Sequence, residues 1–387
     1  MSILGMKIAV VGGGISGLAV ARALALRGAS VTVLEQAGEI TEVGAGLQIS
    51  PNGFAVLDAL GLGDDLARVS VRGEAVSLRD YRKAEVLRLD LTRLQNRNYF
   101  FVHRADLIDV LARGAREAGV QIRLLQQVSE VIPGMPPTIR LKNGSDMHPD
   151  LVIGADGLHS RVRVALNGAD KPFFTRQTAW RAVVPNSDKI GSVARVHMGP
   201  GRHVVSYPLR DGALLNIVAV QERADWVDEG WHHADNPDNL RAAFADFGSE
   251  VQDMLARVTE VRLWGLFRHP VAPRWTGENT TILGDAAHPT LPFLAQGACM
   301  GLEDAWALAD ELANTDDIAV GLAAYQQRRH ARASRVIDAA TGNAWKYHLG
   351  FPPLRLAAHT ALRLGGALMP DRLMHQFDWL YLHDETR

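Results

Sequence analysis

The segment KIAVVGGGISGLAVARALALRGASVTVLE (Lys7–Glu35) decides the fold of this chain. Its first run, residues 7–12, is β-branched and ends in glycine, as buried parallel strands do. A helical repeat of leucine and alanine follows over residues 15–27, and Gly28 stands in the position of a helix C-terminal cap. Residues 30–35 read as a second strand. Strand, helix and strand in this order predict a parallel sheet with right-handed crossovers.

Three glycines of this segment, Gly12, Gly14 and Gly17, fit the pattern G-x-G-x-x-G. The first permits a tight turn, the second lets the backbone approach a diphosphate, and the third lets the helix lie close to the strand. A diphosphate there meets the free N–H groups of the helix N-terminus. Glu35 closes the second strand about 20 residues on, where a carboxylate accepts hydrogen bonds from both ribose hydroxyls and repels a 2′-phosphate. A glycine-rich turn can also be purely structural, but the ordered set of strand, glycines, helix, strand and acid favours a dinucleotide site. The predicted cofactor contacts here are Gly12, Gly14, Ile15, Ser16, Gly17, Glu35 and Gln36.

The composition is that of an ordinary globular protein and excludes several classes. The 387 residues are 47% hydrophobic and 22% charged, and the net charge of −2 gives no reason to expect nucleic-acid or membrane binding. The N-terminal stretch loosely imitates a signal peptide, but three consecutive glycines argue against one, and Arg22 and Arg27 interrupt the best candidate for a membrane span. A single cysteine, Cys299, fits a reducing compartment. We therefore expect a cytoplasmic protein.

The middle of the chain changes character. From Pro172 to about Val220 the hydrophobic period is two, with proline and glycine turns, which predicts an antiparallel sheet. Residues 280–287 return to a strand followed by glycine, and helical patterns cover 302–313 and 320–340. These patterns predict a mixed α/β fold, in which a Rossmann-like nucleotide-binding domain carries an inserted antiparallel substrate domain and C-terminal helices. The expected ranges are 1–171 and 279–340 for the nucleotide-binding domain, 172–278 for the inserted domain and 341–387 for the helical tail.

The tail contains PPLRLAAHTALRLGGALMP, residues 352–370, which is amphipathic. Such a helix can serve a membrane surface or a dimer interface, but packing on its own domain is the favoured interpretation.

Three further stretches carry a family resemblance: EVGAGLQISPNG (Glu42–Gly53), GADGLHSRVR (Gly154–Arg163) and TTILGDAAHPTLPFLAQGACMGLEDA (Thr280–Ala305). Together with the first glycines, they resemble the motifs of the single-component FAD-dependent aromatic monooxygenases. That family includes the 4-hydroxybenzoate and salicylate hydroxylases, 3-hydroxybenzoate 6-hydroxylase and 6-hydroxynicotinate 3-monooxygenase. The resemblance implies that the first motif binds FAD.

The resemblance also implies roles for the later motifs. Asp156 would touch FAD and help to receive NAD(P)H, and the alternative for it is a turn that caps the helix near Leu158. Asp285 would hydrogen-bond the ribityl chain of FAD. Ala295 departs from the family, which often has glycine before Gln-Gly.

Arg104 would reach the ribityl and phosphate region, and the alternative for this residue is an ion pair with Asp106 or Asp109. Gly297 and Ala298 would open a helix whose N–H groups face the flavin pyrimidine, Pro292 would lie at the flavin face where oxygen reacts, and Gly46, Leu47 and Val128 complete the implied contacts.

The substrate side is expected on the antiparallel sheet. In HVVSYPLR, His203, Val205 and Tyr207 share one face of a strand. Similar salicylate-type hydroxylases place a histidine here as the base toward the substrate phenol, so His203 is the candidate catalytic residue; the alternative is a histidine on an edge strand that faces solvent. Arg181 either walls the pocket and holds a carboxylate or is a solvated residue at a sheet edge. The expected pocket residues are Gln48, Arg181, Val205, Tyr207 and Pro292, and no metal site is expected because His288 lacks ligand spacing.

The function that the resemblance implies is aromatic hydroxylation. NAD(P)H, with NADH favoured, would reduce FAD, and O₂ would form a flavin C4a-hydroperoxide that hydroxylates a small hydroxylated aromatic or N-heteroaromatic acid. Dimers are common in the family, so a homodimer is one expected assembly. Two alternatives stay open: a flavin monooxygenase acting on a polyprenyl phenol or a carotenoid, and a flavoprotein reductase or sensor.

Overall fold

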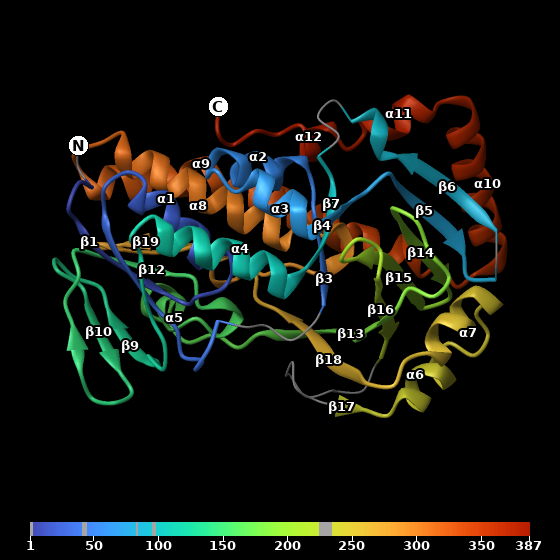
Figure 1. Ribbon diagram of the computed structural model, residues 1–387, viewed down its shortest axis with the longest axis horizontal. Coiled ribbons are helices and arrows are strands. Elements are labelled where there is room, and N and C mark those ends of the chain that lie inside the picture. The colour runs from blue at the N-terminus through green and yellow to red at the C-terminus, as the bar shows by residue number, and fades with distance from the viewer. Residues whose placement is uncertain (1–2, 41–44, 83, 95–97, 224–233) are drawn as a thin grey trace.

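The computed structural model describes residues 3–40, 45–82, 84–94, 98–223 and 234–387 (Figure 1). The predicted loop residues Glu42, Val43 and Gly44 therefore lie outside the described residues.

A six-stranded sheet forms the nucleotide-binding half, with the strand order β19-β20-β12-β1-β2-β8. Every pairing in it is parallel except that of β19 with β20. The short apolar runs that end in glycine become its central strands, because strands buried on both faces need no alternation of polar residues. The strands are β1 (Lys7–Val11), β2 (Ser30–Leu34), β8 (Gln121–Arg123), β12 (Leu151–Gly154), β19 (Thr276–Gly277) and β20 (Thr280–Ile282).

Helices pack on this sheet and bury its apolar side chains. Helix α1 contacts both α4 and α8, and α8 contacts α9, so these helices form one layer (Figure 1). A second, three-stranded sheet of order β11-β10-β9 adds side chains to the same core. The bounds are α1 (Ile15–Ala25), α2 (Pro51–Ala59), α3 (Gly63–Val69), α4 (Arg104–Glu117), α5 (Arg161–Asn167), α8 (Gly297–Ala313), α9 (Ile318–Tyr347), β9 (Val128–Ile132), β10 (Thr138–Leu141) and β11 (Asp146–Met147).

An eight-stranded sheet forms the other half, with the order β17-β18-β13-β16-β15-β14-β5-β6. All of its pairings are antiparallel except that of β14 with β5. Apolar side chains of α6 and α7 cover one face, and the face opposite carries the candidate site. The bounds are β5 (Ala75–Asp80), β6 (Glu85–Asp90), β13 (Phe173–Pro185), β14 (Val193–Gly199), β15 (Arg202–Leu209), β16 (Leu214–Glu222), β17 (Ala234–Asp235), β18 (Val261–Arg268), α6 (Pro237–Ala243) and α7 (Ser249–Ala256).

The mixed α/β fold class with a Rossmann-like domain and a largely antiparallel sheet is confirmed. Strands β5 and β6 join the large sheet although they come from the range 1–171, which the sequence assigned to the nucleotide-binding domain. The division into four ranges otherwise stays a prediction.

The two halves are joined by a short sheet and by the tail. The sheet has the order β3-β7-β4, with β3 (Gly46–Ile49), β7 (Phe100–His103) and β4 (Ser70–Arg72). In the tail, α10 (Pro352–Leu368) packs on β6 at the far end of the molecule, and α11 (Pro370–His375) and α12 (Asp378–Tyr381) lead back toward the helical layer (Figure 1). Among the described residues, no helix combines the length and apolar character needed to cross a membrane.

A buried ion network holds the helical layer together. The guanidinium of Arg329 on α9 lies between Glu303 and Asp304 of α8, at 2.7 and 2.8 Å, and Glu385 of the C-terminal segment, at 2.6 Å. Arg329, Glu303 and Asp304 have no exposed side-chain surface. Since two elements and the C-terminus share one buried cation, the network fixes their mutual position.

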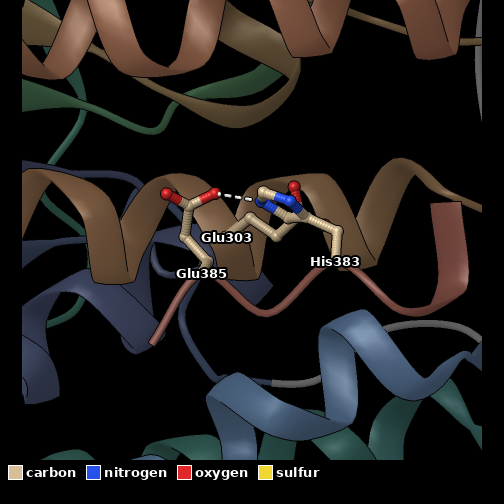
Figure 2. Close-up of side chains that lie close together, drawn as sticks. All are labelled: Glu303, His383 and Glu385. Atoms are coloured by element: carbon tan, nitrogen blue, oxygen red, sulfur yellow. Dashed lines mark hydrogen bonds and ion pairs between the residues drawn. The ribbon is translucent and has the colours of Figure 1, made fainter. Parts of the chain in front are cut away.

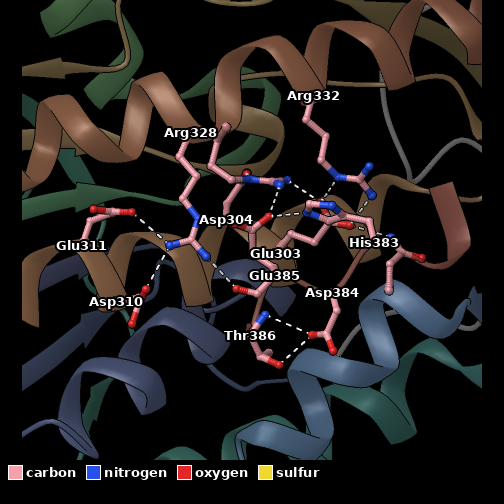
Figure 3. A network of polar contacts seen from close by, with 12 residues as sticks. Glu303, Asp304, Asp310, Glu311, Arg328, Arg332, His383, Asp384, Glu385 and Thr386 are labelled. Atoms are coloured by element: carbon pink, nitrogen blue, oxygen red, sulfur yellow. Dashed lines mark hydrogen bonds and ion pairs between the residues drawn. The ribbon is translucent and has the colours of Figure 1, made fainter. Parts of the chain in front are cut away.

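Two further arginines of α9 extend the network, as Figure 3 shows. Arg332 donates to Glu303, and Arg328 donates to Glu385 and to two acids of α8, Asp310 and Glu311. Burial alone would raise the pKa of Glu303, but the arginines offset that effect and hold the pKa at about 2.

Replacement of Arg329 by methionine is expected to cost about 3–5 kcal/mol of unfolding free energy, because it leaves buried carboxylates without their shared partner. Urea denaturation would measure the loss. The matched control is Arg140→Met, which removes the half-exposed pair with Glu130 at 2.7 Å and should cost about 1 kcal/mol or less. Equal losses in the two variants would contradict a central role for Arg329.

The same network predicts an acid dependence of stability. The pKa of Glu303 falls from 4.5 to about 2 on folding, and that of Asp304 falls from 3.8 to about 2 because His288 and Arg329 offset the effect of burial. A depressed folded-state pKa gives stability that is present above the unfolded pKa and is lost as pH falls through the folded one. The unfolding free energy should therefore fall between pH 4.5 and about 2, and Arg329→Met should weaken this slope. Denaturation at stepped pH tests this, and an unchanged slope in the variant would contradict it.

Candidate active site

The turn between β1 and α1 has room for a ligand on one side only. Gly12 has a φ of 104°, and a Cβ there would overlap the carbonyl oxygen of Ala155. A Cβ at Gly17 would overlap the carbonyl oxygen of Gly12, because the helix starts directly against the strand. A Cβ at Gly14 would meet no atom within 4 Å, and Gly14 caps α1 without any side-chain hydrogen bond. The first turn of α1, which includes Ile15 and Ser16, is thus open to an anion at Gly14.

Glu35 lies at the rim of this turn. One carboxylate oxygen accepts a hydrogen bond from the N–H of Gly13 at 2.7 Å, and the other accepts from the N–H of Ala37 at 2.8 Å. The side chain is half-buried and the neighbouring Gln36 is exposed. The carboxylate therefore stands beside the glycine turn, and its contact with a ribose stays a prediction.

Asp156 lies on the other side of the turn, against Gly12. Its carboxylate accepts from the hydroxyl of Ser160 at 2.5 Å and from the N–H of Arg161 at 2.7 Å, at the start of α5. Burial raises its pKa, and these two hydrogen bonds act in the opposite direction. The side chain of Asp156 thus binds the start of α5 and makes no capping hydrogen bond to the 3₁₀ helix Gly157–His159, so the predicted cap near Leu158 is not observed. Contact of Asp156 with FAD stays a prediction.

The family motif in residues 280–305, the third of the three later stretches and here the third motif, contacts the glycine-rich first motif at Ser16. A Cβ at Gly284 or at Gly301 would contact the Ser16 hydroxyl, so no larger residue fits at either place without a shift. Asp285, in the short 3₁₀ helix η3 (Gly284–Ala286), lies near Arg104 at the start of α4. Burial raises the pKa of Asp285, while His288 and Arg104 lower it.

Asp106, one of the two alternative partners predicted for Arg104, is engaged elsewhere. Asp106 accepts hydrogen bonds of 2.8 and 3.0 Å from Arg210 instead. Burial lowers the pKa of Arg104, and Asp285 counteracts this. The structure thus brings together two predicted cofactor residues from distant parts of the chain.

The N-terminus of α8 is held by a chain of amide hydrogen bonds. Gln296 donates to the Ser50 hydroxyl at 2.9 Å and accepts from Asn52 at 3.0 Å, and Asn52 also donates to Glu303 at 2.7 Å. The first turn, with Gly297 and Ala298, is therefore tied to the ion network. Ala295, where the family often has glycine, adopts a φ of 54°, the left-handed region that glycine enters without steric cost.

His203 lies in the interior of the large sheet, since β15 pairs with both β14 and β16. It is only 2% exposed, so the alternative of a solvent-facing histidine on an edge strand is wrong. Its ring lies 5.5 Å from that of Phe293 and 5.4 Å from that of Tyr347, measured between centroids. Phe293 directly follows Pro292 in the 3₁₀ helix η4 (Pro292–Leu294), so the predicted base meets the third motif.

Two residues that the sequence did not indicate complete this part of the site. His203 Nδ1 lies 2.7 Å from Nε2 of His348, just beyond the end of α9, and His348 Nδ1 lies 2.7 Å from Oε1 of Glu222. Glu222, at the end of β16, has a side chain that is 53% exposed. Burial lowers the pKa of His203 well below its ordinary value, and His348 lowers it further. Burial also lowers the pKa of His348, with Glu222 acting against it.

Arg181 and Tyr207 lie on the same sheet. The Arg181 guanidinium stacks over Trp264, 4.3 Å from the ring centroid, and burial lowers the Arg181 pKa to about 10. Tyr207 packs on Phe101 with ring centroids 5.2 Å apart, and burial raises its pKa. The partly buried Val205 belongs to the apolar cluster beside it.

The predicted cofactor loop packs directly against this sheet. Gly46 donates its N–H to Asn216 on β16 at 2.7 Å, and a Cβ at Gly46 would lie 2.6 Å from the Tyr207 ring. Gln48 accepts from the hydroxyl of Tyr99 at 2.7 Å. Leu47 is half-buried in β3, and Val128 is buried in β9.

Among the described residues, one group of two acids and a histidine has the spacing of metal ligands. Ligand atoms of Glu303, His383 and Glu385 lie within 4.8 Å of one another, and His383 bonds Glu385 at 2.8 Å (Figure 2). Arg332 donates to Glu303, and Arg329 pairs with both acids. A metal cation would stand against these guanidinium groups, so the cluster belongs to the ion network.

Comparison with known proteins agrees with this geometry. A family model described as "FAD binding domain" matches residues 5–340. A 3-amino-4-hydroxybenzoate 2-monooxygenase of Streptomyces platensis is 32% identical, over 97% of this chain and 95% of that protein. A 3-hydroxybenzoate 6-hydroxylase of Klebsiella oxytoca is 31% identical, over 97% of this chain and 96% of that protein. The structure of HpxO of Klebsiella pneumoniae with FAD and uric acid is similar with a TM-score of 0.84 and 25% identity, over 97% of each chain.

Two glycine variants separate cofactor binding from folding. Gly14→Ala adds a methyl group to open space and should leave the melting temperature of the apoprotein unchanged, while it weakens FAD binding at least about tenfold, since the methyl group stands where the diphosphate approaches. Gly17→Ala should lower the melting temperature of the apoprotein itself, because its Cβ overlaps backbone. Thermal melts and FAD fluorescence titration measure both effects. Wild-type FAD affinity in Gly14→Ala would contradict the site.

Proposed function

The chain belongs to the FAD binding domain family, and from this we propose that it is a FAD-dependent monooxygenase that uses NAD(P)H and O₂ to hydroxylate a small hydroxylated aromatic or N-heteroaromatic acid. The related proteins support this substrate class, since they are named for 3-amino-4-hydroxybenzoate and 3-hydroxybenzoate. The observation that carries the proposal is the meeting of the third cofactor motif, at Phe293, with a sheet face that carries a buried histidine.

The residues fit FAD. The open side of α1 at Gly14 suits the diphosphate, and Glu35 suits the ribose hydroxyls. Arg104 and Asp285 would hold the ribityl chain, and the first turn of α8 would face the pyrimidine ring. Bound FAD would accept a hydride from NAD(P)H and activate O₂. NADH stays the expected donor.

His203 would take the proton of the substrate hydroxyl. Burial keeps the imidazole neutral at neutral pH by lowering its pKa, so a lone pair is available to accept a proton. Loss of the proton makes the ring electron-rich, and an electrophilic oxygen then attacks it more readily. The rings of Phe293 and Tyr347 would keep water away from this histidine.

Arg181 would bind the carboxylate of the acid. Its guanidinium lies on the substrate face, stacked on Trp264, and its lowered pKa shows that the charge is costly in this buried position. An anion held against it would offset that cost. Gln48, Val205, Tyr207 and Pro292 would complete the pocket.

A second candidate is hydroxylation of a large apolar substrate. It is favoured by apolar side chains along α10 that are 51–74% exposed, namely Leu354, Leu356, Leu364 and Leu368. Such a face would line the approach of a lipid substrate.

Cytoplasmic location remains a proposal that rests on the buried Cys299, which forms no disulfide. A homodimer remains a proposal that rests on the resemblance to the family.

The deciding experiment measures NADH and NADPH oxidation by the FAD-loaded protein. The panel contains hydroxylated aromatic acids, N-heteroaromatic acids and quinol-type phenols, with benzoate as the control without a hydroxyl. A hydroxylated acid should stimulate oxidation at least about tenfold over benzoate, with little hydrogen peroxide, because the ring must be activated to consume the oxidant. Stimulation by lipid-like phenols alone would favour the second candidate, and the absence of any stimulation would contradict both.

A further inference from the structure

The contacts of His203 point to a route for the substrate proton. We infer that His203, His348 and Glu222 form a directional proton relay, in which Nε2 of His203 faces the substrate hydroxyl and Glu222 delivers the proton to solvent. This inference rests on the proposed function, because it names how the base of that reaction is oriented and discharged. His348 and Glu222 are positioning residues, since they act through His203.

The carboxylate of Glu222, at the solvent-exposed end of the relay, sets the direction of both hydrogen bonds. A carboxylate can only accept, so Glu222 takes its 2.7 Å bond from an N–H at Nδ1 of His348. A neutral imidazole carries one proton, so Nε2 of His348 is left as an acceptor. It then accepts, at 2.7 Å, the proton on Nδ1 of His203. Nε2 of His203 is therefore unprotonated and can accept a proton.

The surroundings support a neutral pair. Burial lowers the pKa of both histidines and so favours the neutral form of each ring, although Glu222 acts against this at His348. Backbone contacts fix the second histidine, because the carbonyl of His348 accepts from the N–H of Gly201 at 3.1 Å, and the carbonyl of Gly201 accepts from the N–H of Glu222 at 2.9 Å.

The proton step balances without a redox change. The substrate O–H bond breaks as an N–H bond forms at Nε2 of His203. The proton on Nδ1 of His203 passes to Nε2 of His348, and the proton on Nδ1 of His348 passes to Oε1 of Glu222. Since the Glu222 side chain is 53% exposed, it can release this proton to water. When the product ring regains its aromatic form, the reverse sequence returns one proton to its oxygen.

The tautomers of His203 and His348 can be determined by NMR, without any measurement of enzyme activity. Two-dimensional ¹H–¹⁵N spectra of the protein labelled at its 14 histidines report which nitrogen of each ring is protonated. His203→Gln and His348→Gln assign the two signals. The relay requires that both rings carry the proton on Nδ1 at neutral pH. A proton on Nε2 of either ring, or a doubly protonated His348, would overturn it.

The kinetic test uses Glu222→Gln, whose amide oxygen can still accept from His348 but cannot take up the proton. We expect kcat for substrate hydroxylation to fall at least about tenfold, because the variant has lost one proton-transfer group. KM should stay within about twofold of the wild-type value, since substrate binding is not affected. Added formate should restore kcat in the variant in proportion to its concentration and leave the wild type unchanged. A wild-type kcat, or a loss that formate does not restore, would contradict the relay.

A second pair of variants guards against loss of folding. His348→Phe should lower kcat at least as much as Glu222→Gln. The matched control is His359→Phe, which replaces another buried histidine, 3.5 Å from Asp80, and should leave kcat unchanged.

Failure of the proposed function can be distinguished from failure of the relay. If no compound stimulates the wild type, the proposed function fails. Nδ1 protonation in the spectra would then still support the hydrogen-bond direction, and Nε2 protonation would overturn that direction. If the wild type is stimulated and kcat is unchanged in both Glu222→Gln and His348→Phe, only the relay fails.

Discussion

The shared burial of Arg329 among Glu303, Asp304 and Glu385 is the constraint on which the rest of the structure depends. An isolated buried cation would be strongly destabilising, so the three carboxylates and the arginine must assemble together. They come from α8, α9 and the C-terminal segment, and these elements cannot slide past one another without separating the charges. The network also reaches the candidate site, because Glu303 accepts from Asn52, which in turn bonds Gln296 at the start of α8.

Helix α9 transmits the same constraint to the substrate side. His348 lies 19 positions after Arg329, which corresponds to about 28 Å along a helix. A helix anchored by buried charge at one point and by apolar packing along its length places its C-terminal residues with little freedom. Tyr347 and His348 can therefore meet His203 across the boundary between the two halves. The contact of His348 with His203, the proposed base, thus depends on an ion network far from it.

The sequence predicted what is local and missed what is assembled over long range. The turn at Gly12–Gly17 and the helix start at Gly297 follow from backbone conformation and close packing, which a short segment specifies by itself. The strand face that carries His203 also followed from its period of two. Nothing local indicates that β5 and β6 join the large sheet, or that His348 meets a residue 145 positions earlier. Adjacent Glu303 and Asp304 in the apolar N-terminal part of α8 were a local signal of buried ion pairing.

A site closed to water needs its own path for protons. In the proposed reaction, aromatic rings such as those of Phe293 and Tyr347 would protect a reactive oxidant from water, and they would also exclude the solvent that could carry a proton away from the substrate ring. A lone buried imidazole that took this proton would become a desolvated cation, which its lowered pKa shows to be unfavourable. A second imidazole and an exposed carboxylate avoid that charge, because each ring releases one proton as it gains another. Exclusion of water and removal of the proton are then compatible in one site.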